Sequence, residues 1–142
     1  MNNYTRQQII IEWLQDYNAF KASIENLEET INDIAEAGMG INYDKDPSGP
    51  TNQFSSTTEN AVLKMDKEKI THKIKVMANI VNKLDRALQS LDDIEREVIT
   101  NRCIKGQYYY QFCGKISVSE RTAKRIKEKA LRKMNIVIFG KE

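Results

Sequence analysis

The sequence predicts an all-α protein, built as a long antiparallel helical hairpin followed by a C-terminal helix-turn-helix. Apolar residues recur at steps of three and four through residues 10–34, which is the spacing of one face of a helix. Both prolines lie within residues 46–50, so long proline-free segments stand on either side of that stretch. The last third of the chain combines a helical apolar pattern with many basic residues, which is typical of short helices that expose one charged face.

Residues 5–36 are expected to form one long helix with a narrow apolar seam. A two-residue seam of this kind cannot stabilise a lone helix, which must bury it against another helix. Gly38 offers a plausible end to the helix. The seam follows a heptad spacing through Ile10, Trp13, Tyr17, Phe20, Ile24, Leu27, Ile31 and Ile34.

Residues 38–56 are expected to form a long loop, because Gly, Pro, Asn, Asp and Ser dominate them. Ser56 and Glu59 then have the spacing of a capping box, which predicts that a second long helix covers residues 57–89.

The simplest arrangement pairs the two long helices as an antiparallel hairpin within one chain. A dimeric coiled coil is the alternative, and two hairpins can also combine into a four-helix bundle. We therefore expect residues 1–89 to be an acidic helical hairpin that serves in assembly or partner contact. A homo-oligomer is expected, with a dimer favoured.

A new helix is expected after Ser90, which can cap it. It covers residues 91–104, presents Ile94, Val98 and Ile99 to a core, and ends at Gly106. Residues 90–142 then form the second predicted domain, the helix-turn-helix DNA-binding domain. If the boundary lies at 89/90, this domain is expected to fold and to bind DNA on its own.

The helix-turn-helix is predicted within residues 106–134. Residues 107–114 form its first helix, and residues 116–118 form the turn. Ser119 caps a second helix over residues 120–134. The buried face of this helix is expected to hold Ala123, Ile126, Ala130 and Leu131.

The small net charge of the chain hides a strong asymmetry. From residue 101 to the end there are eleven Lys or Arg against three Glu, so 11 − 3 = +8. Residues 1–100 hold eleven basic and seventeen acidic residues, so 11 − 17 = −6, and the sum is the stated +2. An acidic body with a basic end is expected where one end of a protein meets nucleic acid.

The second helix of the motif has the residues that a recognition helix needs. Arg121, Thr122 and Arg125 lie in its first turns, where such a helix meets base edges in the major groove. Basic residues farther along are expected at phosphates. The alternative is a basic amphipathic helix whose charged face is merely solvated or lies on a membrane surface. Against the membrane, the apolar face holds two alanines and no large Phe or Trp. The predicted DNA-binding set is Ser119, Arg121, Thr122, Lys124, Arg125, Lys127, Lys129, Arg132 and Lys133.

Residues 91–134 resemble region 4 of bacterial sigma factors. The resemblance runs through Leu91, Glu95-Arg96-Glu97-Val98-Ile99, Arg102, Gly106, Ile116-Ser117-Val118-Ser119 and Ala130-Leu131. The whole chain is similar to the RinA/ArpU-type phage late-gene transcriptional regulators. These resemblances imply a sequence-specific DNA-binding activator of phage late, packaging or lysis genes that contacts host RNA polymerase. Ser117 departs from the pattern, because such turns commonly have glycine there.

Neither a catalytic motif nor a metal or cofactor motif is present in the sequence, so no enzyme activity is expected. Cys103 and Cys113 are expected to be reduced thiols, at least one of them packed in the core, and His72 is expected on a solvated helix face. The N-terminal residues lack a signal-peptide pattern, which predicts a cytoplasmic location in the bacterial host. The alternative functions are a phage small-terminase-type DNA-packaging protein and a helical adaptor that binds a sigma or anti-sigma partner without DNA.

Overall fold

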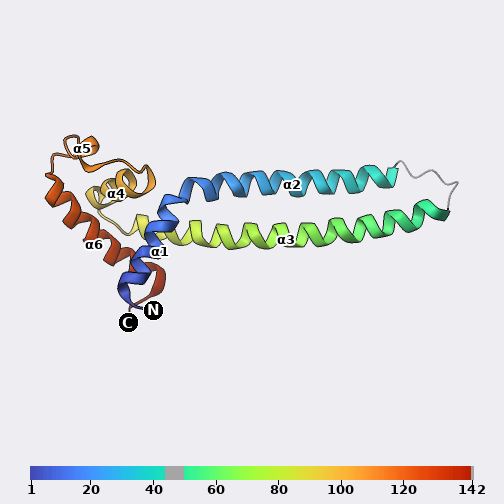
Figure 1. Cartoon of the computed structure of the whole chain (residues 1–142), viewed down its shortest axis with the longest axis horizontal. Coiled ribbons are helices and arrows are strands. Elements are labelled where there is room, and N and C mark those ends of the chain that lie inside the picture. Colours follow the sequence, from blue (N-terminus) through green and yellow to red (C-terminus); the bar gives the residue numbers. More distant parts are fainter. Residues whose placement is uncertain (44–49, 142) are drawn as a thin grey trace. The chain divides into compact units, whose positions relative to one another are not determined.

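The computed structural model describes residues 1–43 and 50–141, with side chains described for residues 1–36 and 64–141. Its described residues form helices and no strand, so the predicted all-α class is confirmed (Figure 1). In chain order the elements are α1 (Asn3–Gln15), α2 (Tyr17–Tyr43), α3 (Pro50–Gln89), α4 (Asp93–Ile99), the π-helix η1 (Thr100–Ile104), α5 (Tyr109–Phe112) and α6 (Glu120–Phe139).

The chain divides into two compact units, at places other than the predicted boundary at 89/90. The first unit joins Met1–Phe20 to Asn79–Glu142, and the second is Lys21–Ala78. The N-terminal helix therefore belongs with the C-terminal helices. The reason is tertiary, because α1 buries its apolar side chains in the same core as α6.

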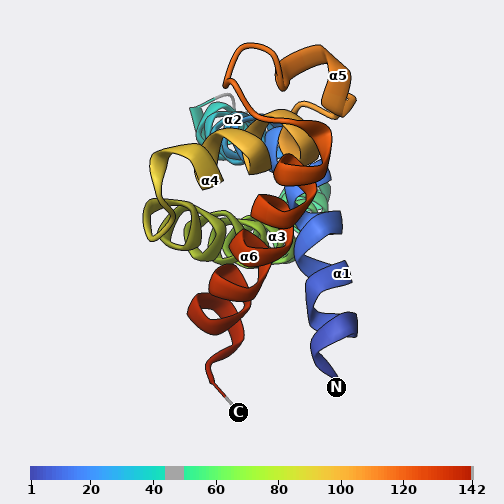
Figure 2. The ribbon, with the colours of Figure 1, turned by 90° about the vertical axis from the view of Figure 1, so that its left-hand side faces the viewer.

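The main core of the first unit is built from both ends of the chain. Figure 2 shows α1 lying beside α6, and Trp13 of α1 stacks on Phe139 of α6 with ring centroids 6.1 Å apart. Ile10 and Leu14 are fully buried there. The buried members of this core are Ile10, Leu14, Leu84, Ala87, Leu91, Ile99, Cys103, Ala130, Leu131 and Met134.

The predicted single helix over residues 5–36 is interrupted at Asp16, which lies between α1 and α2. The Asp16 backbone N–H still bonds to the Glu12 carbonyl at 3.1 Å, but the residue has ψ near 2°, outside the helical range. The interruption changes which face is buried. Of the predicted seam residues in α1, Ile10 is fully buried and Trp13 is half-buried, and Leu14, which lies outside the predicted seam, is fully buried as well.

The predicted loop over residues 38–56 is shorter in the structure. The backbone is helical up to Tyr43 and again from Pro50, so only residues 44–49 of that range lie outside the described ones. Proline is tolerated in the first turn of a helix, because no N–H is needed there. The second long helix therefore begins before the capping-box spacing at Ser56 and Glu59, whose side chains are outside the described ones.

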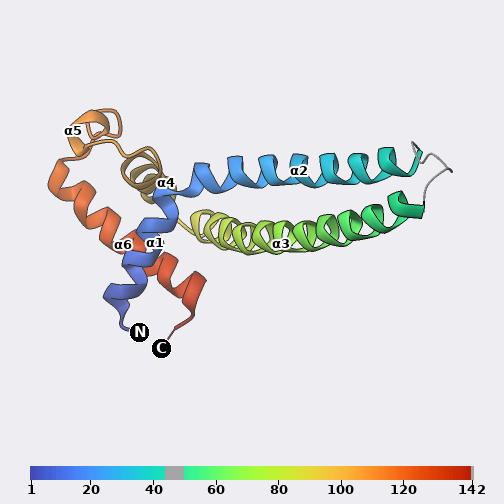
Figure 3. The same cartoon turned by 45° about the vertical axis from the view of Figure 1, so that its right-hand side comes forward.

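The second unit contains most of α2 and α3, which run in opposite directions (Figures 1 and 3). The predicted seam residues of α2, among them Ile24, Leu27 and Ile31, are half-buried. On α3, Ile70 and Ile74 are half-buried as well, and His72 is exposed as expected. Among the described side chains of this unit none is buried, which sets it apart from the first unit.

The residue that caps the start of α4 is Asp92, and not Ser90 as predicted. The Ser90 hydroxyl instead donates to the Ala87 carbonyl at 2.6 Å, which extends the end of α3. Glu95 of the same turn accepts the Asp92 backbone N–H at 3.0 Å, so the helix start is closed by its own carboxylate. Val98 and Ile99 are fully buried as predicted, whereas Ile94 is 40% exposed, because it lies at the edge of the buried face that Glu95, Val98 and Ile99 form.

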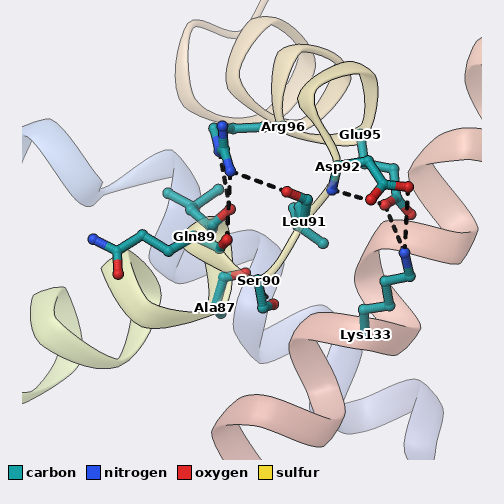
Figure 4. A network of polar contacts seen from close by, with 9 residues as sticks. Ala87, Gln89, Ser90, Leu91, Asp92, Glu95, Arg96 and Lys133 are labelled. Atoms are coloured by element: carbon teal, nitrogen blue, oxygen red, sulfur yellow. Dashed lines mark hydrogen bonds and ion pairs between the residues drawn. The ribbon is translucent and has the colours of Figure 1, made fainter.

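Arg96 closes the end of α3 from the next helix. Its Nε donates to the Leu88 carbonyl at 3.0 Å, and a terminal nitrogen donates to the Leu91 carbonyl at 3.0 Å (Figure 4). The last carbonyls of a helix have no partner within it, so a guanidinium that bonds to them stabilises that end. The path from α3 into α4 is therefore held by one side chain.

Candidate nucleic-acid interface

A short second core attaches α5 and the following turn to α6. Phe112 and Cys113 are buried against Ala123 of α6 and Val98 of α4. The Val118 backbone N–H bonds to the Cys113 carbonyl at 3.2 Å and closes the turn. Helix α5 is shorter than the predicted span 107–114, because its first residues are extended up to the cap at Tyr108.

Ser117 adopts φ of +58° in this turn, the conformation that the sequence predicted for a glycine-like position. A side chain in left-handed backbone is strained by about 1–2 kcal/mol. The residue is exposed.

We expect Ser117→Gly to raise the free energy of unfolding by about 1 kcal/mol, because glycine adopts positive φ without the clash at Cβ. Chemical denaturation of the full chain measures this. Ser90→Gly is the control and should destabilise, because its hydroxyl bonds to a backbone carbonyl. A Ser117→Gly variant no more stable than the parent would contradict the strain.

Helix α6 begins at the predicted residue. The Ser119 hydroxyl accepts the Thr122 backbone N–H at 3.1 Å and donates to the Thr122 hydroxyl oxygen at 2.9 Å. Ser119 is thus engaged in capping, and the Thr122 hydroxyl retains its hydrogen for another acceptor. The helix runs past the predicted end at Met134 to Phe139, and Gly140 with φ of +83° terminates it.

The apolar face of α6 lies where the sequence places it. Ala123, Ala130 and Leu131 are buried, and Ile126 is half-buried. Met134 extends the buried face by another turn. Small side chains at Ala123 and Ala130 allow close packing of the helix on the rest of its unit.

Lys124 of α6 is exposed beside the Tyr109 ring, and four further exposed basic side chains, Arg121, Arg125, Lys129 and Arg132, lie on the face of α6 opposite the apolar one. Their spacing of four, four and three places them along one side of the helix. None of the four forms an ion pair with a described residue, and Glu128 is the acidic residue among them. Their charges are therefore available to a ligand in solution.

The remaining predicted basic residues of α6 lie against their own unit. The Lys124 Nζ is 5.6 Å from the centroid of the Tyr109 ring, and Arg102 lies 5.1 Å from the same centroid. Lys127 is half-buried. Lys133 donates to Glu95 Oε1 at 2.7 Å and lies 3.7 Å from Asp92 Oδ2 (Figure 4).

The pair of Glu95 and Lys133 ties α6 to the start of α4. Glu95 is 3% exposed, and its second oxygen has no hydrogen-bond partner among the described residues. Burial raises the pKa of Glu95, but hydrogen bonds from Lys133 and from the Asp92 backbone outweigh it, so the pKa lies below its usual value. The same hydrogen bond to Glu95 raises the pKa of Lys133.

Sequence reasoning missed the supporting role of Glu95, although its position three residues after Asp92 is a capping-box signal. Tyr109 is half-buried, and its ring lies against that of Phe112. Tyr108 and Tyr110 are exposed and stacked, with ring centroids 5.8 Å apart. Both cysteines are buried as free thiols, and burial raises the pKa of Cys103 and Cys113, which leaves them poor nucleophiles.

Residues 7–135 match the family described as "Protein of unknown function (DUF722)". The chain belongs to this family. The DUF722 match begins in α1 and ends in α6, so it includes both units and the four exposed basic residues. No curated protein and no solved structure matches the chain.

Membrane-spanning helices and metal-binding clusters are both absent from the described residues of this DUF722 chain. No helix among them is both long enough and apolar enough to cross a membrane. In the same residues, no group of three or more His, Cys, Asp or Glu side chains is arranged to hold a metal ion.

Proposed function

We propose that this protein is a sequence-specific DNA-binding transcriptional regulator, an activator of phage late genes in the RinA/ArpU manner. The observation that carries the proposal is the face of α6, where Arg121, Arg125, Lys129 and Arg132 are exposed without ion-pair partners. In this proposal α5, the turn and α6 form a helix-turn-helix, and α6 is its recognition helix. An α-helix of this kind fits the major groove of B-form DNA.

The start of α6 is assigned to base contacts. Arg121 and Arg125 can each place two donors on the O6 and N7 acceptors of guanine, and the free hydrogen of the Thr122 hydroxyl can reach a base or phosphate. Lys129 and Arg132 lie farther along the helix and are assigned to phosphates, which fix the position of the protein on the duplex.

The other members of the predicted DNA-binding set are given supporting roles. Ser119 caps the helix, Lys124 lies over Tyr109, and Lys133 is engaged by Glu95. Lys127 is half-buried; burial raises the pKa of Cys103, and the charge of Lys127 offsets part of that rise. We propose that these four residues hold α6 in place, and that the four exposed residues carry most of the contact with DNA.

The proposal includes the partners that the resemblance implies. The protein acts without catalysis in the cytoplasm of the bacterial host, on double-stranded DNA and with contact to host RNA polymerase. The helices of the second unit form a hairpin for self-association. A ring-forming DNA-packaging role is the second candidate, favoured by the half-buried seam of these helices. A closed ring of many subunits, seen by native mass measurement, would select it.

We expect Arg125→Ala to weaken binding to a selected DNA site by about 1–3 kcal/mol and to relax the preference at one base pair. Lys129→Ala should weaken binding to selected and scrambled DNA alike, because a phosphate contact carries no sequence information. Fluorescence anisotropy titrations of both variants on both DNAs measure the difference. Lys83→Ala, exposed on α3, is the control and should leave both affinities unchanged.

Equal losses on both DNAs for Arg125→Ala would contradict base reading by this residue. Binding that ignores both DNA and salt would favour the adaptor alternative.

A further inference from the structure

The helices of residues 21–78 are here called the arm, and the apolar seam residues among its described side chains, at 21–36 and 64–78, are only half-buried. On α2 this holds for Ile24, Leu27, Ile31 and Ile34, and on α3 for Ile70, Ile74 and Met77. Helix α3 also leaves Met65 57% exposed and Val76 44% exposed. Full burial of such side chains away from water stabilises a fold, so part of that stabilisation is not realised within one chain.

Two helices cannot enclose a core by themselves, because each side chain between them still faces water along both edges of the pair. Four helices can, since every apolar stripe then meets the centre of the bundle. The seams of both helices in the arm are therefore suited to a further pair of helices.

The charges of the arm indicate which helix would lie against which. Residues 21–36 of α2 contain one lysine and five carboxylates, so 1 − 5 = −4. Residues 64–78 of α3 contain five lysines and two carboxylates, so 5 − 2 = +3. These side chains are exposed, and among the described residues none of the carboxylates Glu25, Glu28, Glu29, Asp33 and Glu36 is in an ion pair.

Opposite charges on two helices affect which helix pairs with which more than they raise the affinity of the pair. Pairing α2 with α2, or α3 with α3, places like charges side by side, whereas pairing α2 with α3 opposes unlike charges. One chain carries both signs, so a two-fold pairing with a second copy satisfies both helices at once.

We infer that the arm is one half of a four-helix bundle formed with a second copy of this chain, with the acidic α2 of each copy against the basic α3 of the other. This rests on the proposed function only in assigning self-association to the arm, and it adds the surfaces and their pairing. The bundle buries the half-exposed seams of Ile24 to Ile34 and of Ile70 to Met77. It also brings two copies of α6 into one particle, which raises affinity for a site with two halves.

The test is a charge reversal in the full chain, read by sedimentation without DNA at about 0.1 M salt, where charges within roughly 10 Å still interact. One variant carries Glu25→Lys, Glu29→Lys and Asp33→Lys on α2. The other carries Lys67→Glu, Lys69→Glu and Lys73→Glu on α3. All six positions are exposed, and circular dichroism checks that each variant remains helical.

The unsubstituted chain is expected to be a dimer at micromolar concentration. Each variant alone should dissociate at least about tenfold more readily, because its α2 and α3 now carry the same sign. An equimolar mixture should restore a mixed dimer, since each positive helix of one variant finds a negative helix of the other. Within a chain the two helices still repel each other in the mixture, so only contact between chains can produce the rescue.

Three results would overturn the inference: a monomeric unsubstituted chain, variants that dimerise as well as the parent, or a mixture without rescue. Association that needs a different protein would assign the arm to that partner instead. DNA titrations of the monomeric variants separate this test from the proposed function. Monomeric variants that still bind DNA show that α6 binds DNA independently of dimerisation. A parent dimer that binds no DNA contradicts the proposed function but not the four-helix bundle.

Discussion

A fragment of residues 90–142 is expected to lack a stable fold and to lose nearly all of its DNA binding, although it contains the whole of α4, α5 and α6. The predicted boundary at 89/90 leads to the opposite expectation. The observed core explains the change, because Ile10 and Leu14 of α1 and Leu84 of α3 pack with Leu131 and Met134 of α6. A fragment without these partners exposes the apolar face of α6 to water.

The size of this effect follows from the number of core side chains removed. Truncation of one buried Leu or Ile to Ala typically costs about 2–5 kcal/mol, and whole domains are stable by only about 5–15 kcal/mol. The fragment loses the entire side chains of Ile10, Leu14 and Leu84, so its remaining core cannot offset the entropy of folding. Far-UV circular dichroism with thermal unfolding measures the outcome.

The matched control keeps both ends of the chain and removes the arm. A protein in which residues 21–78 are replaced by a short Gly/Ser linker retains the first unit, and we expect it to unfold cooperatively. Leu14→Ala in the full chain should by itself cost about 2–5 kcal/mol. A fragment of residues 90–142 that unfolds cooperatively and binds DNA like the full chain would show that α1 is dispensable.

Lys133→Met is expected to destabilise the protein more than any other single lysine substitution in α6, and to reverse its response to acid. In the parent the pKa of Glu95 lies below its usual value, so the folded carboxyl holds its proton less tightly than the unfolded one. Its contribution to stability is therefore present above the usual glutamate pKa and is lost as the pH falls through the lowered value.

Removal of the ammonium leaves a carboxylate that is 3% exposed with one hydrogen bond, from the Asp92 backbone. Burial then dominates and raises the pKa of Glu95, so the variant should gain stability as the pH falls below neutral, until other carboxylates protonate. Denaturant unfolding between about pH 4 and pH 7 follows both proteins across the glutamate range. Lys129→Met on the exposed face is the control and should keep the parent's profile. Parallel pH profiles for the parent and Lys133→Met would contradict the coupling.

The elements that the sequence predicted well are those set by local chemistry. Ser119 caps α6 because its hydroxyl bonds three residues ahead, and Gly106 with φ of +68° ends the preceding helix. Ser117 has φ of +58°, at the position where turns of the resembled family commonly have glycine. Each of these features depends on contacts within a few residues, which a sequence displays directly.

The features that the sequence did not predict depend on distant contacts. A heptad pattern continues through Asp16, yet the helix is interrupted there, and the apolar side chains of α1 are buried with α6. Lys133 looked like any other base on the charged face of α6, since its partner Glu95 is 38 residues earlier. Arg121 and Arg125 were predicted to contact DNA, and both are exposed. Neither forms an ion pair with a described residue of its own unit.

The central claim, that the exposed face of α6 reads DNA sequence, is tested most directly by selecting binding sites from random double-stranded DNA with the full chain. The Arg121→Ala, Arg125→Ala double variant is selected in parallel, at the same protein concentration and salt. We expect the parent to enrich one defined sequence. The variant should enrich either no sequence or one that has lost specific base preferences. Enrichment of no sequence by the parent, or of the same sequence by the variant, would contradict it.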